Sequence, residues 1–125
     1  MFSHAFYNVV HIVGIALVMS ALGGAAVHAA NGGTRATQRA RGLVAAMHGL
    51  GAALILVGGF GMLARLGFRH GANFPGWLWV KLGVWATAAA LLAVVGRRPA
   101  LARPALLALP ALAGLAAYMA IYKPV

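Results

Sequence analysis

Four apolar segments, each about as long as a helix that crosses a membrane, make up most of the chain. They run over about Ala5–Val27, Leu43–Leu66, Pro75–Val95 and Pro104–Tyr122, and about 20 apolar residues are needed to cross the hydrocarbon core. Helices satisfy their own backbone hydrogen bonds in lipid, and short connections favour antiparallel neighbours. The sequence therefore predicts an all-α, polytopic membrane protein, with residues 1–125 forming a single domain of four transmembrane helices in an up-down bundle.

The charged residues are all basic, which excludes several kinds of chemistry. The chain has 10 Lys or Arg residues and no Asp, Glu or Cys. It therefore has no carboxylate side chain to act as a general base or to bind Mg²⁺ or Ca²⁺, and no thiolate or disulfide. The basic residues punctuate apolar segments instead of forming one basic face, so the lipid bilayer is the predicted partner and nucleic acid is not.

Basic residues also predict how the chain lies in the membrane. The first loop holds Arg35, Arg39 and Arg41, and the third loop holds Arg97, Arg98 and Arg103. The opposite side has only Arg65, Arg69 and Lys123. Because cytoplasmic loops carry the excess of Lys and Arg, we expect a multi-pass protein of the inner (cytoplasmic) membrane with both termini outside.

Two ionisable residues lie at the same depth within the predicted helices. Lys81 stands between Trp77 and Trp85 at helical spacing, and His11 follows His4 and Asn8 on one face of the first helix, with Tyr7 nearby. Each is about six residues from the outer end of its helix, or roughly 9 Å deep. Such groups usually face the bundle interior or a wet cavity. The alternatives are that Lys81 extends to the outer headgroups and that His11 is a hydrogen-bonded packing residue.

Every aromatic residue falls in the predicted outer half of the bundle. These residues are Phe2, Phe6, Tyr7, Phe60, Phe68, Phe74, Trp77, Trp79, Trp85, Tyr118 and Tyr122. An ordinary aromatic belt marks both membrane interfaces, so the one-sided arrangement has two interpretations. It is either a lopsided interfacial girdle or the wall of a pocket for a flat ligand.

The histidine positions limit how a haem could bind. Two axial ligands must face each other at one depth, but His11 has only His70, in a loop, near its level. His28 and His48 are offset by roughly 7 Å along the helix axis. The pattern is therefore compatible with five-coordinate haem b on His11, or with a site shared between protomers. A Cu(I) site is less well supported, because there is no Met-x-x-Met cluster.

Three stretches of the chain resemble the HemJ-type membrane protoporphyrinogen oxidases and, more distantly, CopD-like four-helix membrane proteins. The stretches are HIVGIALVM at His11–Met19, LILVGGFGML at Leu54–Leu63 and WLWVKLGVW at Trp77–Trp85. The chain has Trp79 or Val80 where HemJ-type proteins usually carry a histidine. The resemblance implies that His11 and Lys81 are functionally required residues and that haem b is a cofactor.

The residues and the resemblance together lead to one main hypothesis. We expect a haem or porphyrin-like ligand in the outer half of the bundle, with HemJ-like oxidation of a porphyrinogen if the chain is an enzyme. His11 would be the axial ligand or proton-transfer group, and Lys81 would pair with a propionate, because an anionic ligand explains a charged lysine at this depth. Tyr7, Phe60, Trp77 and Trp85 would form the walls.

Two further functions remain open. The chain could be a non-catalytic accessory or structural subunit that packs against partner helices through its Gly and Ala faces, either in a homo-oligomer or in a larger membrane complex. It could also be a CopD-like copper-related carrier.

Overall fold

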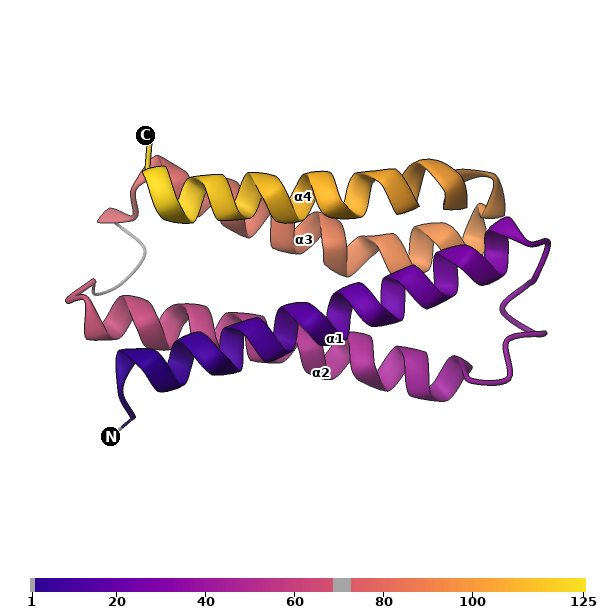
Figure 1. Cartoon of the computed structure of the whole chain (residues 1–125), viewed down its shortest axis with the longest axis horizontal. Helices are drawn as coiled ribbons and strands as arrows, with labels where there is room; N and C mark the ends of the chain where they lie inside the picture. The colour runs from indigo at the N-terminus through magenta and orange to yellow at the C-terminus, as the bar shows by residue number, and fades with distance from the viewer. Residues whose placement is uncertain (1, 69–72) are drawn as a thin grey trace.

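The computed structural model describes residues 2–68 and 73–125, and every regular element within them is a helix (Figure 1). The elements are α1 (His4–Ala30), α2 (Arg41–Arg65), α3 (Gly76–Arg97), the short 3-10 helix η2 (Pro99–Leu101) and α4 (Ala102–Tyr122). Four helical segments are long and apolar enough to cross a membrane. The four predicted helices are thus present, and their bounds differ from the predicted ones by at most three residues. Arg69 and His70 lie outside the described residues.

The helices run alternately up and down, so both chain termini lie at one end of the bundle (Figure 1). We call this the termini end. The opposite end holds the α1–α2 connection, residues 31–40, and the α3–α4 connection around η2. Because Arg35, Arg39, Arg41, Arg97, Arg98 and Arg103 all lie there, we call it the basic end.

Local sequence signals account for where the first two helices begin and end. The hydroxyl oxygen of Ser3 accepts a hydrogen bond from the Phe6 N–H at 3.1 Å and caps α1. Gly32 and Gly67 follow α1 and α2 with φ of 84° and 87°. After α2, the Phe68 N–H donates to Leu63 O and the Gly67 N–H donates to Ala64 O. This left-handed glycine cap satisfies carbonyl groups that the helix end would otherwise leave without partners.

Glycines bring α1 and α2 into close contact. A Cβ atom built on Gly51 would lie 2.8 Å from Gly14 O, and one built on Gly58 would lie 2.5 Å from the backbone nitrogen of His11. Real Cβ atoms do not approach so closely, so both positions require glycine if the backbones are to stay where they are. Close approach of this kind is a main source of helix association in lipid, where the hydrophobic effect does not drive it.

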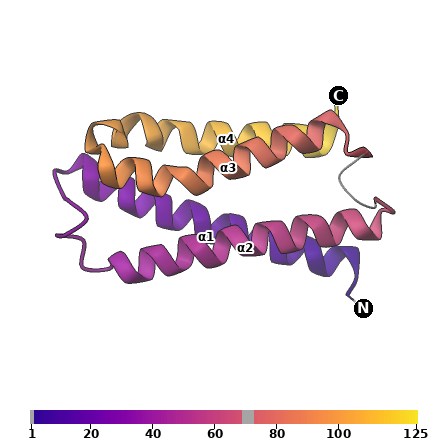
Figure 2. The same ribbon diagram turned by 180° about the vertical axis from the view of Figure 1, so that it is seen from behind.

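The bundle consists of two helix pairs, α1 with α2 and α3 with α4, which separate toward the termini end (Figures 1 and 2). At the basic end, Ala26 of α1 is buried with Val95, Ala102 and Ala105.

Halfway along the bundle, Val18 and Leu22 of α1 pack with Ala88 and Leu109. At the termini end the buried cluster is instead Leu63 of α2 with Trp77 and Leu78 of α3. Toward that end, the buried contacts between the helix pairs thus pass from α1 to α2.

Replacing Gly58 by alanine should separate α1 from α2 and destabilise the protein. The new methyl group would meet the backbone of α1 and not a flexible side chain, and overpacking of this kind costs about 1–3 kcal/mol. We expect Gly58→Ala to lower the unfolding temperature in detergent by several degrees. Gly49→Ala is the matched control on the same helix, because a Cβ at Gly49 would meet nothing within 4 Å. Equal melting of both variants would contradict this packing.

Candidate functional site

A pocket of about 600 Å³ lies between the helix pairs at the termini end, lined by residues of all four helices. Its polar and charged lining residues are His4, Asn8, His11, Lys81 and Lys123. Its aromatic lining residues are Phe60, Trp77 and Trp85, and the remaining lining is aliphatic or glycine. The volume is within the range of about 300–1,000 Å³ that is usual for pockets that bind small molecules or cofactors.

The structure brings five of the six predicted site residues to this pocket. His11, Lys81, Phe60, Trp77 and Trp85 all line it, and Tyr7 does not. The Tyr7 ring instead packs where the side chain of residue 61 would be, and Gly61 has none. Tyr7 therefore belongs to the α1–α2 contact in this structure, although it shares a helix with His11.

A hydrogen bond to the neighbouring helix fixes the orientation of the His11 ring. Its Nδ1 lies 2.8 Å from Ile55 O on α2. A carbonyl oxygen only accepts hydrogen bonds, so Nδ1 must carry the proton in the neutral ring, and Nε2 then keeps a lone pair. A histidine that binds a metal ion commonly donates its other ring N–H to a backbone carbonyl in this way. The ring is thus prepared either to bind a metal centre or to accept a proton at Nε2.

Lys81 brings a positive charge to the same pocket. Its side chain is half-buried, and the chain contains no Asp or Glu side chain that could neutralise it. An uncompensated charge inside a membrane-spanning segment is costly, and such residues usually face a cavity or a partner. Lys81 lines the pocket, which agrees with the prediction that it faces a cavity between the helices.

Lys123 is a second cation at the pocket, which the sequence did not predict. The chain after α4 folds back over the start of α3, where the Trp77 N–H donates to Val125 O at 3.4 Å. Lys123, with φ of 47°, places its Nζ 5.5 Å from the centre of the Trp77 ring and donates to Ala120 O at 2.8 Å. Lys123 thus makes a cation–π contact with Trp77, one of the two tryptophans that flank Lys81 in the sequence.

Two hydrogen bonds hold α2 to α3 at the inner end of the pocket. The Trp85 Nε1–H donates to Ala52 O at 3.0 Å, and His48 Nε2 lies 3.1 Å from Ala88 O. Trp85 and Ala88 both line the pocket, and His48 is buried. The sequence left open what His48 does, and the structure shows it joining two helices.

Some of the aromatic residues form a pocket wall and others form an interfacial girdle, so each of the two interpretations of the sequence holds for part of them. Phe60, Trp77 and Trp85 line the pocket, whereas Trp79, Tyr118 and Tyr122 are exposed side chains of the kind found in an interfacial girdle. Contacts between rings connect the two groups, because Phe74 lies 6.2 Å from Phe60 and 6.0 Å from Trp79, measured between ring centres.

Fold and pocket together define a class: a small protein whose described residues form four helices long and apolar enough to cross a membrane, with a cationic, aromatic-lined cavity between two helix pairs. Comparison of the chain with protein-family models, curated proteins and solved structures gave no significant match. Within residues 2–68 and 73–125, no group of three or more His, Cys, Asp or Glu side chains is placed to hold a metal ion.

Loss of the Trp85 hydrogen bond should weaken the bundle measurably. Trp85→Phe keeps an aromatic ring but removes the donor to Ala52 O, and one such bond contributes about 0.5–1.5 kcal/mol. We expect a corresponding drop in stability in detergent unfolding experiments. Trp79→Phe, an exposed position on the same helix, should change stability little. Equal losses in the two variants would show that the hydrogen bond contributes nothing.

Proposed function

We propose that the pocket at the termini end binds a flat, hydrophobic anion of the haem or porphyrin class. One observation carries the proposal: His11 and Lys81, which come from different helix pairs, line the same aromatic pocket of about 600 Å³. The rest of the lining is almost entirely apolar, which suits the macrocycle of such a ligand.

The charges at the pocket favour an anion over a neutral ligand. Lys81 and Lys123 both line the pocket, and like charges in a low-dielectric region repel each other. A ligand with two carboxylates, such as a porphyrin with two propionates, would neutralise both. Trp77, which already holds the Lys123 ammonium group over its ring, and Phe60 and Trp85 would contact the π faces of the ligand.

His11 fits either of the two roles that the resemblance to HemJ-type proteins implies. With the Nδ1 proton donated to Ile55 O, Nε2 can be the axial ligand of haem b, and a bound haem would supply one-electron redox chemistry. Alternatively, Nε2 accepts a proton from a porphyrinogen undergoing HemJ-like oxidation, with the electrons passing to an acceptor dissolved in the membrane. One nitrogen cannot do both at once, so the two roles are experimentally separable.

A titration with haemin tests the ligand and the role of His11. The purified protein in detergent should give a shifted Soret band with haemin that His11→Ala abolishes. If Nε2 is the axial ligand, a metal-free porphyrin should bind wild type and His11→Ala alike. Lys81→Met should weaken both ligands by roughly tenfold or more, because a hydrogen bond to a charged group contributes about 1.5–3 kcal/mol.

Two variants control for general effects in this titration. His28→Ala removes an imidazole at the basic end, and Arg65→Gln removes one positive charge at the termini end; neither residue lines this pocket. Both should bind haemin as the wild type does. Folded wild-type protein that binds neither haemin nor porphyrin would contradict the proposal and favour an accessory role.

We also propose that the chain lies in the inner (cytoplasmic) membrane with its basic end in the cytoplasm. Six arginines lie at that end, against Arg65 and Lys123 among the described residues at the other. The excess of positive charge supports both termini and the haem pocket lying on the outer side.

Reporter fusions test this orientation. A reporter active only in the periplasm should be active when fused after Val125, and one active only in the cytoplasm should be silent there. Fusion of the same two reporters after Arg39 should give the reverse pattern. Activity of the cytoplasmic reporter after Val125 would invert the topology.

An accessory-subunit role is the second candidate, and glycines on the helix surfaces favour it. Cβ atoms built at Gly23, Gly24, Gly83 and Gly114 would meet nothing within 4 Å. These glycines are not needed for packing inside the chain, and small residues of this kind allow another helix to approach closely in lipid. A copper-carrier role has less support, since the described residues offer no metal-binding group of three or more side chains.

A further inference from the structure

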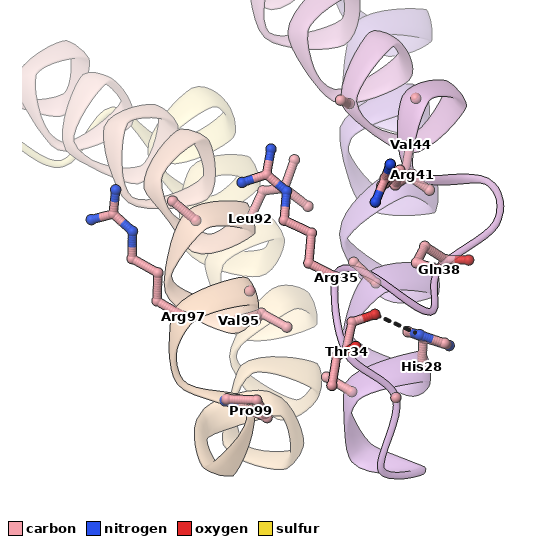
Figure 3. Close-up of a pocket in the computed structure, with 17 residues that line it drawn as sticks. His28, Thr34, Arg35, Gln38, Arg41, Val44, Leu92, Val95, Arg97 and Pro99 are labelled. Carbon is pink, nitrogen blue, oxygen red and sulfur yellow. Dashed lines mark hydrogen bonds between the residues drawn. The ribbon is translucent and has the colours of Figure 1, made fainter.

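A second pocket, of about 460 Å³, lies at the basic end of the bundle (Figure 3). It is enclosed by the end of α1, the α1–α2 connection, the first residues of α2 and the last turns of α3. Arg35, Arg41 and Arg97 line it, each from a different one of these last three segments. We propose that this pocket binds the phosphate group of an anionic phospholipid.

Three arginines line this pocket, and the chain supplies no acidic side chain to neutralise them. The chain has no Asp or Glu, so an anion that neutralises Arg35, Arg41 and Arg97 must come from elsewhere. The planar guanidinium group offers five N–H donors and matches the geometry of a phosphate, often through two parallel hydrogen bonds.

The start of α2 adds a second, independent source of positive potential. Arg41, Gly42, Val44 and Ala45 of its first turns line the pocket, and Ala40 at the N-cap provides no side-chain hydrogen bond. The free N–H groups and the dipole of a helix N-terminus attract an anion. A cation such as Arg41 is unfavourable at this position unless an anion lies beside it.

Hydrogen bonds within the connection, and between the connection and His28, keep its shape fixed. The Thr34 N–H donates to Thr37 Oγ1 at 2.8 Å, and the Thr37 hydroxyl donates to Thr34 O at 3.1 Å. His28 Nε2, at the end of α1, lies 3.0 Å from Thr34 O (Figure 3). The connection is therefore held against α1, and it presents Arg35 and Gln38 to the pocket.

The position of the arginine side chains favours a lipid over a dissolved phosphate. In Figure 3 the three guanidinium groups lie near the level of Leu92, within the last turns of α3, and not beyond the helix ends. The remaining lining is largely apolar, including Val44, Leu92 and Val95. A headgroup phosphate at this level would leave the upper acyl chains against apolar walls, whereas a free phosphate would gain nothing from them.

Lipid titrations of the purified protein in a neutral detergent test the proposal. Dioleoylphosphatidylglycerol, dioleoylphosphatidylcholine and inorganic phosphate are the three probes, and the readouts are bound lipid by native mass spectrometry and the unfolding temperature. The wild type should bind phosphatidylglycerol at least tenfold more tightly than phosphatidylcholine. No such preference, or equal stabilisation by inorganic phosphate, would overturn the proposal of a lipid site.

Two triple variants with the same loss of charge separate a built site from general attraction. Arg35→Gln/Arg41→Gln/Arg97→Gln removes the pocket arginines, and Arg39→Gln/Arg98→Gln/Arg103→Gln removes three arginines of the basic end that do not line the pocket. The first should lose at least tenfold in affinity for phosphatidylglycerol, and the second should change little. Equal losses in both would mean non-specific attraction. If the first variant does not fold, Arg97→Gln against its neighbour Arg98→Gln makes the same comparison.

Discussion

The polar side chains that connect the helices of this bundle are paired with backbone carbonyl oxygens, and the chain has no carboxylate side chain that could take their place. A donor without a partner in lipid costs several kcal/mol, and a carbonyl oxygen in a helix has a second lone pair for such a donor. His11, His48 and Trp85 each use a carbonyl oxygen on a neighbouring helix. All three bonds involve α2, which is thereby tied to α1 on one side and to α3 on the other.

Glycine contacts and these hydrogen bonds shape the space around α2 differently. Gly51 and Gly58 allow the backbones of α1 and α2 to lie in close contact. The hydrogen bonds between α2 and α3 are made by the side chains of Trp85 and His48, which lie between the two helices and hold them apart. The pocket at the termini end begins next to these two hydrogen bonds, at Trp85 and Ala88. The side chains that stabilise the contact between α2 and α3 therefore also keep the pocket open.

Depth along the helices was predictable from the sequence, but rotation about their axes was not. A rise of about 1.5 Å per residue places His11 and Lys81 at one level, and both line one pocket. Rotation is normally read from an apolar stripe, and these helices are apolar on nearly every side. Tyr7 was therefore assigned to the pocket wall, although its ring fits beside Gly61.

The position of Lys123 at the pocket was not predictable from the sequence for a related reason. It depends on a change in the direction of the backbone after α4. The basic-end pocket was missed because its arginines come from three separate segments. In the sequence those arginines indicated only which loops are expected to face the cytoplasm.

The absence of acids also explains why both pockets are positively charged. Carbonyl oxygens can accept hydrogen bonds from neutral donors such as the Trp85 indole, but they cannot neutralise the full charge of Lys81 or Arg41. Where helices pack closely, a cation without a carboxylate partner has no favourable place, and the cations lie instead toward the two ends of the bundle. At both ends the cation then faces a space open to outside molecules. The anions that we propose for the two pockets differ because the pocket walls differ: aromatic rings at the termini end, and arginine side chains with a helix N-terminus at the basic end.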